Sequence, residues 1–193
     1  MSDDNPISAL LSRRSVAVRR LGGPGPSPAE LAGILAAATM APDHGALRPW
    51  RLIEIGAGAR AGLADIFVAA KRKAQPELTQ AEIDRERDKA LRPPVLIALV
   101  ARPRKDHPVV TAAEQMATAG AAMQNILIAA HLLGYGAIIL SGARCQDQDI
   151  RTRLGILPPE EFLGFISIGS IVDTPLLSRR PDLADMVTRI DRL

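Results

Sequence analysis

The sequence predicts a one-domain α+β protein or α/β sandwich, and three observations support this fold class. Segments with helical and strand periodicity alternate irregularly along the 193 residues, without an internal repeat or a long linker. Hydrophobic residues make up 47% of the chain, enough for one substantial core and too many for a disordered protein. One long helical segment, residues 112–133, is apolar or small almost all round and must therefore be covered on every side.

The first two predicted helices flank a stretch rich in glycine and proline. We expect a short helix over residues 5–15, "NPISALLSRRS", because "GGPGPSP" then interrupts the chain. Ser27 and Glu30 stand three residues apart with Pro28 between them, which is the pattern of a capping box at a helix start. An apolar face follows, and we expect this second helix to end near Met40.

The next segments predict a strand and two helices. Residues 50–55, "WRLIEI", alternate between apolar and polar side chains, as in a half-buried strand. A third helix is expected over residues 59–74. A second capping box, Thr79 to Glu82, opens the charged segment "TQAEIDRERDKALR". Its mixed charges favour a solvated helix, with a lid over residues 71–92 as the alternative.

The second half of the chain begins with a buried strand, "VLIALVA", which is continuously apolar and rich in β-branched residues. A third capping box, Thr111 to Glu114, opens the long apolar helix, which we expect to end at Gly134. Two further strands, "GAIILSG" and "EFLGFISIGS", flank a short amphipathic helix near residues 147–154. The tail is rich in proline and arginine.

The long apolar helix also predicts an assembly. A chain of this length with one sheet can hardly cover such a helix alone, so a second subunit is the simplest cover. The small residues Ala117, Gly120 and Ala121 would let helices approach closely across a homodimer interface. The alternative is a central helix wrapped by its own chain.

Composition argues against nucleic-acid and metal sites. Aromatic residues are only 3% of the chain, too few for a base-stacking surface, and the net charge is only +3. The three histidines, His44, His107 and His131, lie far apart, and the one cysteine adds no cluster of soft ligands. We therefore expect no nucleic-acid partner and no metal.

Several features indicate a protein of the reducing cytoplasm. Cys145 is the only cysteine, so no internal disulfide can form, and we interpret it as a small buried hydrophobe rather than a nucleophile. The start, "MSDDNPISALL", is acidic and lacks the pattern of a signal peptide. The long apolar helix carries polar groups that would be costly in lipid, such as Gln124, Asn125 and His131, so we expect no membrane span.

A dinucleotide-binding fold is a weak rival. The segment "GAGARAG", with Gly56, Gly58 and Gly62, follows a predicted strand and loosely resembles a phosphate-binding glycine turn. The spacing has one residue too many, and a charged helix stands where a second parallel strand should end in an acid.

Two stretches hold side chains that their local structure does not need. Arg13, Arg14 and Ser15 can grip a phosphate through charge-assisted bonds, although arginines near a helix end also complement the helix dipole. The connector "MAPDHGALRPWR", residues 40–51, gathers Asp43, a histidine, two arginines and the only tryptophan.

These stretches, with "SPAELAGILAAATMAP", "AGAAMQNILIAAHLLGYG", "IILSGA" and "GFISIGS", resemble the nitroreductase family in order and spacing over almost the full chain. The motif "APDH" and a short insert region resemble its compact YdjA-like branch. The resemblance implies a nitroreductase-like α+β sandwich, with a central, mainly antiparallel sheet flanked by helices. It also implies an intertwined homodimer that binds FMN at the subunit interface.

The resemblance further implies which residues contact the flavin. Arg13, Arg14 and Ser15 would surround its phosphate and ribityl chain, with Arg180 as a weaker match near the phosphate. The remaining implied contacts are Met40, the loop residues His44 and Arg48, which would reach the flavin of the other subunit, and the strand end Ile139, Leu140 and Ser141.

The implied activity is reduction of nitroaromatic or quinone-type acceptors by NADH or NADPH, with FMN rather than a side chain carrying the chemistry. This chain departs from many relatives at Ala17, where a basic residue is common, at Arg48, where an amide is common, and at Ile139, where some relatives have a bulkier residue. Two alternatives stay open. They are a flavin-binding or sensing module without turnover, and a flavin enzyme of the same fold with oxygen-dependent or dehalogenating chemistry.

Overall fold

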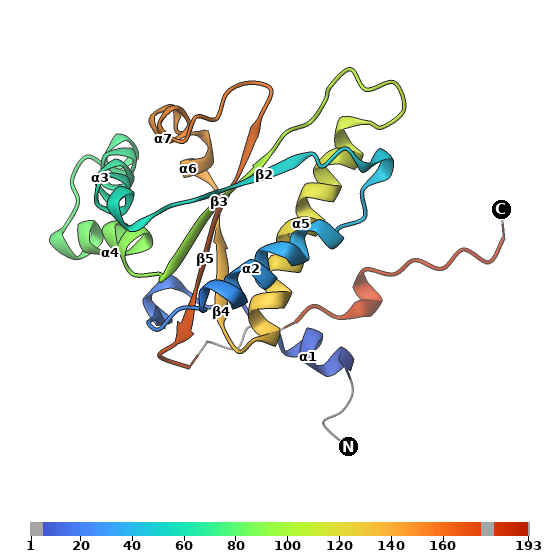
Figure 1. Ribbon diagram of the computed structural model, residues 1–193, viewed down its shortest axis with the longest axis horizontal. Coiled ribbons are helices and arrows are strands. Elements are labelled where there is room, and N and C mark those ends of the chain that lie inside the picture. The colour runs from blue at the N-terminus through green and yellow to red at the C-terminus, as the bar shows by residue number, and fades with distance from the viewer. Residues whose placement is uncertain (1–5, 175–179, 193) are drawn as a thin grey trace.

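The computed structural model describes residues 6–174 and 180–192 and shows a sheet with helices on both faces (Figure 1). The strands are β1 (Leu21–Gly22), β2 (Trp50–Glu54), β3 (Val95–Ala101), β4 (Gly136–Leu140) and β5 (Glu161–Ile171). The α-helices are α1 (Pro6–Ser12), α2 (Pro28–Ala36), α3 (Ala57–Ala74), α4 (Gln80–Leu91), α5 (Ala112–Leu132), α6 (Ala143–Gln146) and α7 (Gln148–Arg153). Short 3-10 helices are η1 (Val18–Arg20), η2 (Ala37–Met40), η3 (His44–Ala46) and η4 (Leu183–Asp185).

The sheet is organised around β5, which pairs with β1, β3 and β4, while β2 pairs with the other edge of β3. Each of these ladders is antiparallel, which confirms the mainly antiparallel sheet that the family resemblance implied. The strand before the glycine segment, β2, is therefore part of an antiparallel pair. The parallel unit that a dinucleotide-binding turn requires is not formed there.

Side chains of β3 alternate between two cores, as a strand period of two requires. Ile97 and Leu99 face the core shared with α2 and α5, and Ala98 and Val100 face the core shared with α3, α4 and α7. Phe165 of β5 centres the second core, where it packs edge-to-face against two other phenylalanine rings at centroid distances of 4.9 and 5.1 Å. The sheet is thus buried between two helical layers (Figure 1).

The three predicted capping boxes are confirmed. In each, a hydroxyl oxygen accepts from the backbone N–H three residues later, and the glutamate there accepts from the backbone N–H of the capping residue. These boxes begin α2 at Ser27, α4 at Thr79 and α5 at Thr111. The local chemistry of the sequence therefore determines where these helices start.

Some predicted boundaries were wrong. The first helix ends at Ser12 rather than at Ser15, because the chain then becomes extended: Ser15 forms a parallel bridge with Ala137, whose carbonyl accepts from the Val16 N–H at 3.0 Å. Asn5, its predicted first residue, lies outside the described residues. The third helix, expected over roughly residues 59–74, spans Ala57–Ala74, whereas β1 and α6 were not predicted.

A bulge in β5 lets the end of β4 come close. The register of β3 and β5 shifts between Leu99 and Val100, and Gly164, opposite Leu99, has a φ of 144°. A Cβ at Gly164 would stand 2.6 Å from the carbonyl oxygen of Leu140. Only glycine fits, because both the backbone conformation and the neighbouring carbonyl exclude a side chain.

We expect Gly164→Ala to lower the free energy of unfolding by about 2 kcal/mol or more, because it combines backbone strain with a backbone clash. Urea denaturation followed by circular dichroism would measure the change. Gly62→Ala in α3 is the matched control, since Gly62 is exposed and a Cβ there meets nothing within 4 Å. The control should be neutral or stabilising by about 0.5–1 kcal/mol. Equal urea midpoints for the two variants would contradict the role of the bulge.

Candidate functional site

Three arginines lie together after the end of α1 and form what we call the arginine cluster: Arg13, Arg14 and Arg180. A guanidinium nitrogen of Arg180 donates to the backbone carbonyl of Arg13 at 2.5 Å, although the two are far apart in sequence. Arg14 donates to the carbonyl of Leu11 at 2.7 Å, at the C-terminal end of α1. Within the described ranges, none of the three pairs with a carboxylate.

The electrostatics of the arginine cluster suit an anion. Burial, followed by the positive charges of Arg180 and Arg14, lowers the pKa of Arg13 below its ordinary value. An arginine nevertheless stays protonated in a protein, so three like charges remain close together. The Nε of Arg14 is buried and has no hydrogen-bond acceptor among the described atoms. A phosphate would offset the repulsion and could accept from this nitrogen.

The end of β4 lies beside the extended segment that follows the arginine cluster. The bridge between Ser15 and Ala137 sets this arrangement, and the strand continues through Ile139 and Leu140 to the exposed Ser141. The side chain of Ile139 packs into the α5 core and that of Leu140 into the α3 core. The structure thus places the end of β4 beside the segment that begins with Arg13, Arg14 and Ser15, as a shared ligand would require.

A cavity of about 390 Å³ lies between Ala17, the face of β4 that carries Ile138 and Leu140, and the helices α3 and α4. Its wall includes the basic side chains of Lys71, Arg85 and Lys89. These residues were not among the predicted site residues, because their segment has the mixed charges of a solvated helix or a lid. The excess of basic residues in this segment does not itself reveal which face of a helix meets a cavity.

Glu86 fixes one wall of this cavity. Its carboxylate is almost fully buried and forms ion pairs with Lys89 and, at 2.7 Å, with Arg144. Burial raises the pKa of Glu86, but hydrogen bonds and ion pairs with these two cations outweigh it, and the net shift is downward. The charged segment forms a helix, as one of the two interpretations expected, but its Glu86 is buried and paired rather than solvated.

The loop at residues 40–50 is held in an unusual conformation by Asp43. Its carboxylate accepts from the backbone N–H of Leu47 at 3.2 Å and from that of Arg48 at 2.7 Å. Ala46 and Arg48 have φ values of 51° and 47°, in the left-handed backbone region that residues other than glycine seldom adopt. Asp43 thus organises the loop. The loop and its surroundings line a cavity of about 570 Å³, whose wall includes Met40, Arg48 and Trp50.

The loop and the arginine cluster lie at opposite ends of α5 (Figure 1). His44 contacts Glu114 in the first turn of α5, with Nδ1 and Oε1 3.4 Å apart. Ser12, next to the arginine cluster, contacts His131 in the last turn, with Oγ and Nε2 3.0 Å apart. At a rise of about 1.5 Å per residue, the helix places Glu114 and His131 about 26 Å apart. The structure therefore does not bring His44 and Arg48 to the arginine cluster of the same chain.

Other kinds of site find little support. Across residues 6–174 and 180–192, no group of three or more histidine, cysteine, aspartate or glutamate side chains is arranged to hold a metal ion. Burial raises the pKa of the Cys145 thiol, so it is not poised as a nucleophile. The same part of the chain contains no helix with the length and apolarity needed to cross a bilayer.

Comparison with known proteins identifies the family. The sequence model of the nitroreductase family matches residues 10–170. YdjA of Escherichia coli (strain K12), provisionally named an NAD(P)H nitroreductase, is 29% identical over 164 residues, which cover 85% of this chain and 87% of YdjA.

Solved structures agree. A nitroreductase-like family protein from Bacillus cereus has a TM-score of 0.77 at 23% identity and covers 99% of both chains. A structure from Desulfovibrio desulfuricans, provisionally described as a nitroreductase in complex with FMN, has a TM-score of 0.72 at 28% identity, covering 97% of this chain and 98% of that one. The match of the family model over most of the chain, together with this fold, shows that the protein belongs to the nitroreductase family.

Proposed function

We propose that the protein is a single-domain, cytoplasmic, FMN-dependent NAD(P)H oxidoreductase, spanning residues 1–193 and acting as a homodimer with two flavin sites at the subunit interface. Its acceptors would be nitroaromatic or quinone-type compounds. Bound FMN would supply the redox chemistry, taking a hydride from NADH or NADPH at N5 and passing the electrons to the acceptor in alternating half-reactions. The observation that carries this proposal is that the arginine cluster and the loop with His44 and Arg48 lie at opposite ends of α5.

The arginine cluster fits the phosphate of FMN. It offers guanidinium groups without a carboxylate partner among the described residues and a buried Arg14 Nε without an acceptor there, and both features favour an anion. Ser15 follows directly and would donate its hydroxyl to the phosphate or the ribityl chain. The end of β4, Ile139 to Ser141, lies along the continuation of this segment and would support the flavin ring through its backbone.

The cavity between β4 and α4 supports a redox role. The family resemblance implies a basic residue at the position of Ala17, and the absence of that residue is the main argument for a module without turnover. Lys71 and Arg85 line the same cavity as Ala17 and would return positive charge to this side of the site, whereas Lys89 is already paired with Glu86. Cationic groups stabilise the negative charge that a flavin gains on reduction. Arg48 of the partner chain would add a further cation.

Exposed apolar residues support the homodimer. The described surface carries large apolar side chains on α1, at the end of α5 and in the C-terminal segment, which extends away from the body in Figure 1. These include Leu11, Leu132, Leu183, Met186, Val187 and Ile190, all more than 60% exposed. Ala117 of α5 is also exposed, and a Cβ on Gly120 would meet nothing within 4 Å. A second chain would cover these surfaces.

The first test concerns turnover. Under anaerobic conditions, NADH or NADPH should bleach the flavin absorption of the FMN-loaded protein, and a nitroaromatic or quinone should restore it. Persistent colour with both donors would favour the module without turnover. If only oxygen restored the colour, with products of oxygen insertion or dehalogenation, the alternative chemistry would replace the proposal.

The second test concerns binding of the FMN phosphate by the arginine cluster. Arg13→Ala should raise the FMN dissociation constant by about tenfold or more, because a charge-assisted partner is lost. Fluorescence titration with FMN would measure it, and circular dichroism would show that the fold is unchanged. Arg153→Ala is the matched control, since Arg153 is an exposed arginine on α7 outside the proposed site. An unchanged constant for the Arg13 variant would remove this residue from the site.

The third test asks whether each site is shared between two chains. Arg13→Ala and His44→Ala must each impair activity as homodimers. Refolding the two variants together should form about half mixed dimers, each with one intact site of two, so activity should recover to about a quarter of the wild-type value. If both residues served one site of one chain, every site in a mixed dimer would carry a lesion, and no activity would return.

A further inference from the structure

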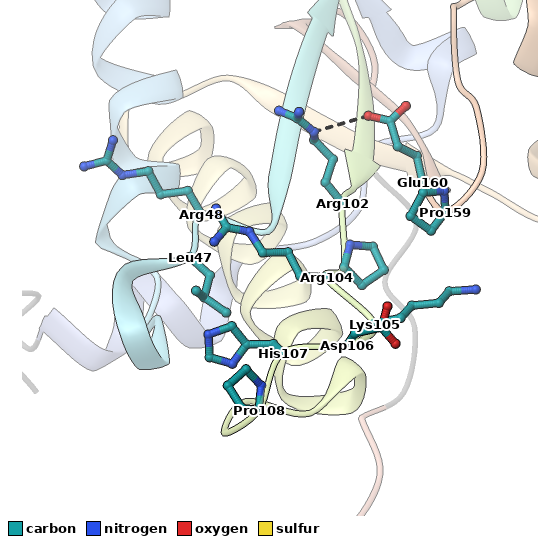
Figure 2. Close-up of a pocket in the computed structure, with 11 residues that line it drawn as sticks. Leu47, Arg48, Arg102, Arg104, Lys105, Asp106, His107, Pro108, Pro159 and Glu160 are labelled. Atoms are coloured by element: carbon teal, nitrogen blue, oxygen red, sulfur yellow. Dashed lines mark ion pairs between the residues drawn. The ribbon is translucent and has the colours of Figure 1, made fainter.

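A larger cavity of about 970 Å³ adjoins the loop at residues 40–50 and shares only Arg48 with the proposed flavin site (Figure 2). Its wall is formed by Leu47 and Arg48 from the loop, by the segment 102–108 that follows β3, and by Pro159 and Glu160 before β5. Arg48 lines both this cavity and the loop cavity, so the two spaces are neighbours. A volume of this size fits a nucleotide-sized ligand rather than a single small ion.

The wall carries more basic than acidic side chains, with Asp106 and Glu160 as its acidic residues. Glu160 is already paired with Arg51 at 2.8 Å and with Arg102 at 3.3 Å. Arg104 and Lys105 have exposed side chains and form no ion pair among the described residues. Figure 2 shows Arg102 turned toward Glu160, whereas Arg104 extends toward Leu47 and leaves its guanidinium group available to a ligand.

The backbone under Arg104 is fixed by a buried glutamine. Gln115 of α5 is 1% exposed, and its side-chain oxygen accepts from the Arg104 N–H at 2.8 Å. Its amide donates to the carbonyls of Arg104 and Val110 at 3.0 and 3.1 Å. The segment is therefore held from inside the protein while its charged side chains point outward. A side chain on such a backbone is positioned for binding at a low entropic cost.

His107 adds a donor to the same wall. Its Nδ1 accepts from the backbone N–H of Val110 at 2.9 Å, so in the neutral ring the proton sits on Nε2. Figure 2 shows the His107 ring beside Leu47, on the side of the cavity toward which Arg104 extends. The wall thus combines a guanidinium fork, a ring N–H and an apolar surface, a set that suits a phosphorylated nucleoside.

We infer that this cavity binds the adenosine end of the electron donor and selects NADPH over NADH through its 2′-phosphate. The inference rests on the proposed function, because that function places the reacting end of the donor at the neighbouring flavin site. Both donors carry the same pyrophosphate, and only NADPH adds a phosphate dianion on the ribose. The unpaired Arg104, supported by Lys105, provides the charge that distinguishes them.

The test uses the FMN-loaded dimer and two matched double variants. Arg104→Gln with Lys105→Gln removes two charges from the cavity, and Arg72→Gln with Arg153→Gln removes two exposed charges from α3 and α7. Wild type should show a kcat/KM for NADPH about tenfold or more above that for NADH. The cavity variant should lose about tenfold with NADPH and less than about twofold with NADH. The control variant should retain the preference.

A second measurement needs no turnover. Adenosine 2′,5′-bisphosphate should bind the wild-type dimer more tightly than adenosine 5′-monophosphate in calorimetry, and the cavity variant should lose this difference. Arg104→Gln alone serves if the double variant does not fold. Equal use of both donors by wild type, or equal losses in the cavity and control variants, would overturn the inference and leave the proposed function intact. Failure of both donors to reduce FMN would refute the proposed function, while the calorimetry would still decide what the cavity binds.

Discussion

The packing of α5 against the sheet is the constraint on which the rest of the molecule depends. One face of this helix, with Ala122, Ile126 and Ala130, is buried in the core that β3 and β5 share. Its first turn holds the loop at residues 40–50, and its last turn holds α1. A buried helix with satisfied backbone hydrogen bonds cannot shorten, so the distance between these attachments is a fixed property of the fold. The proposed partition of the flavin site between two chains rests on this distance.

Local features of the fold could be predicted because their causes are local. The three capping boxes lie within four residues each, and the continuous apolar run of β3 identifies a buried strand by itself. Non-local features could not be predicted in this way. The extended turn after Ser12 depends on a partner at Ala137, and the bulge at Gly164 depends on the carbonyl of Leu140. Strand partners of this kind are set by the tertiary arrangement and leave no local pattern.

The residues of the candidate site likewise separate into those that the sequence identified and those that it did not. Arg13 and His44 stood out by residue type, but only the resemblance to a family assigned them to a common ligand, since nothing in their spacing predicts one. Lys71 and Lys89 were missed, because helical periodicity in a strongly charged segment does not show which residues face a cavity and which face water. Asp43 stood out as chemically capable, yet the structure uses its carboxylate to hold the loop. Residue type alone therefore did not separate structural from functional groups.

The distribution of acidic groups explains how a chain with a net charge of only +3 presents several cationic surfaces. Glu30, Glu82 and Glu114 are used as helix caps, and hydrogen bonds from the Thr79 backbone and hydroxyl, with a further one from Gln75, lower the pKa of Glu82 to about 2. Glu86 and Glu160 are paired inside the structure. Because so many carboxylates are committed to internal contacts, arginines in the arginine cluster and in the segment after β3 remain available to anionic ligands.

The left-handed conformations at Ala46 and Arg48 bear on how the loop meets a ligand. Asp43 imposes them through two hydrogen bonds, so their energetic cost is met during folding rather than during binding. The loop accordingly loses little conformational freedom when a ligand arrives, and more of each contact contributes to affinity. Asp43 can therefore govern the strength of binding from a position where its own carboxylate faces the backbone, so the residue that tunes recognition need not touch what is recognised.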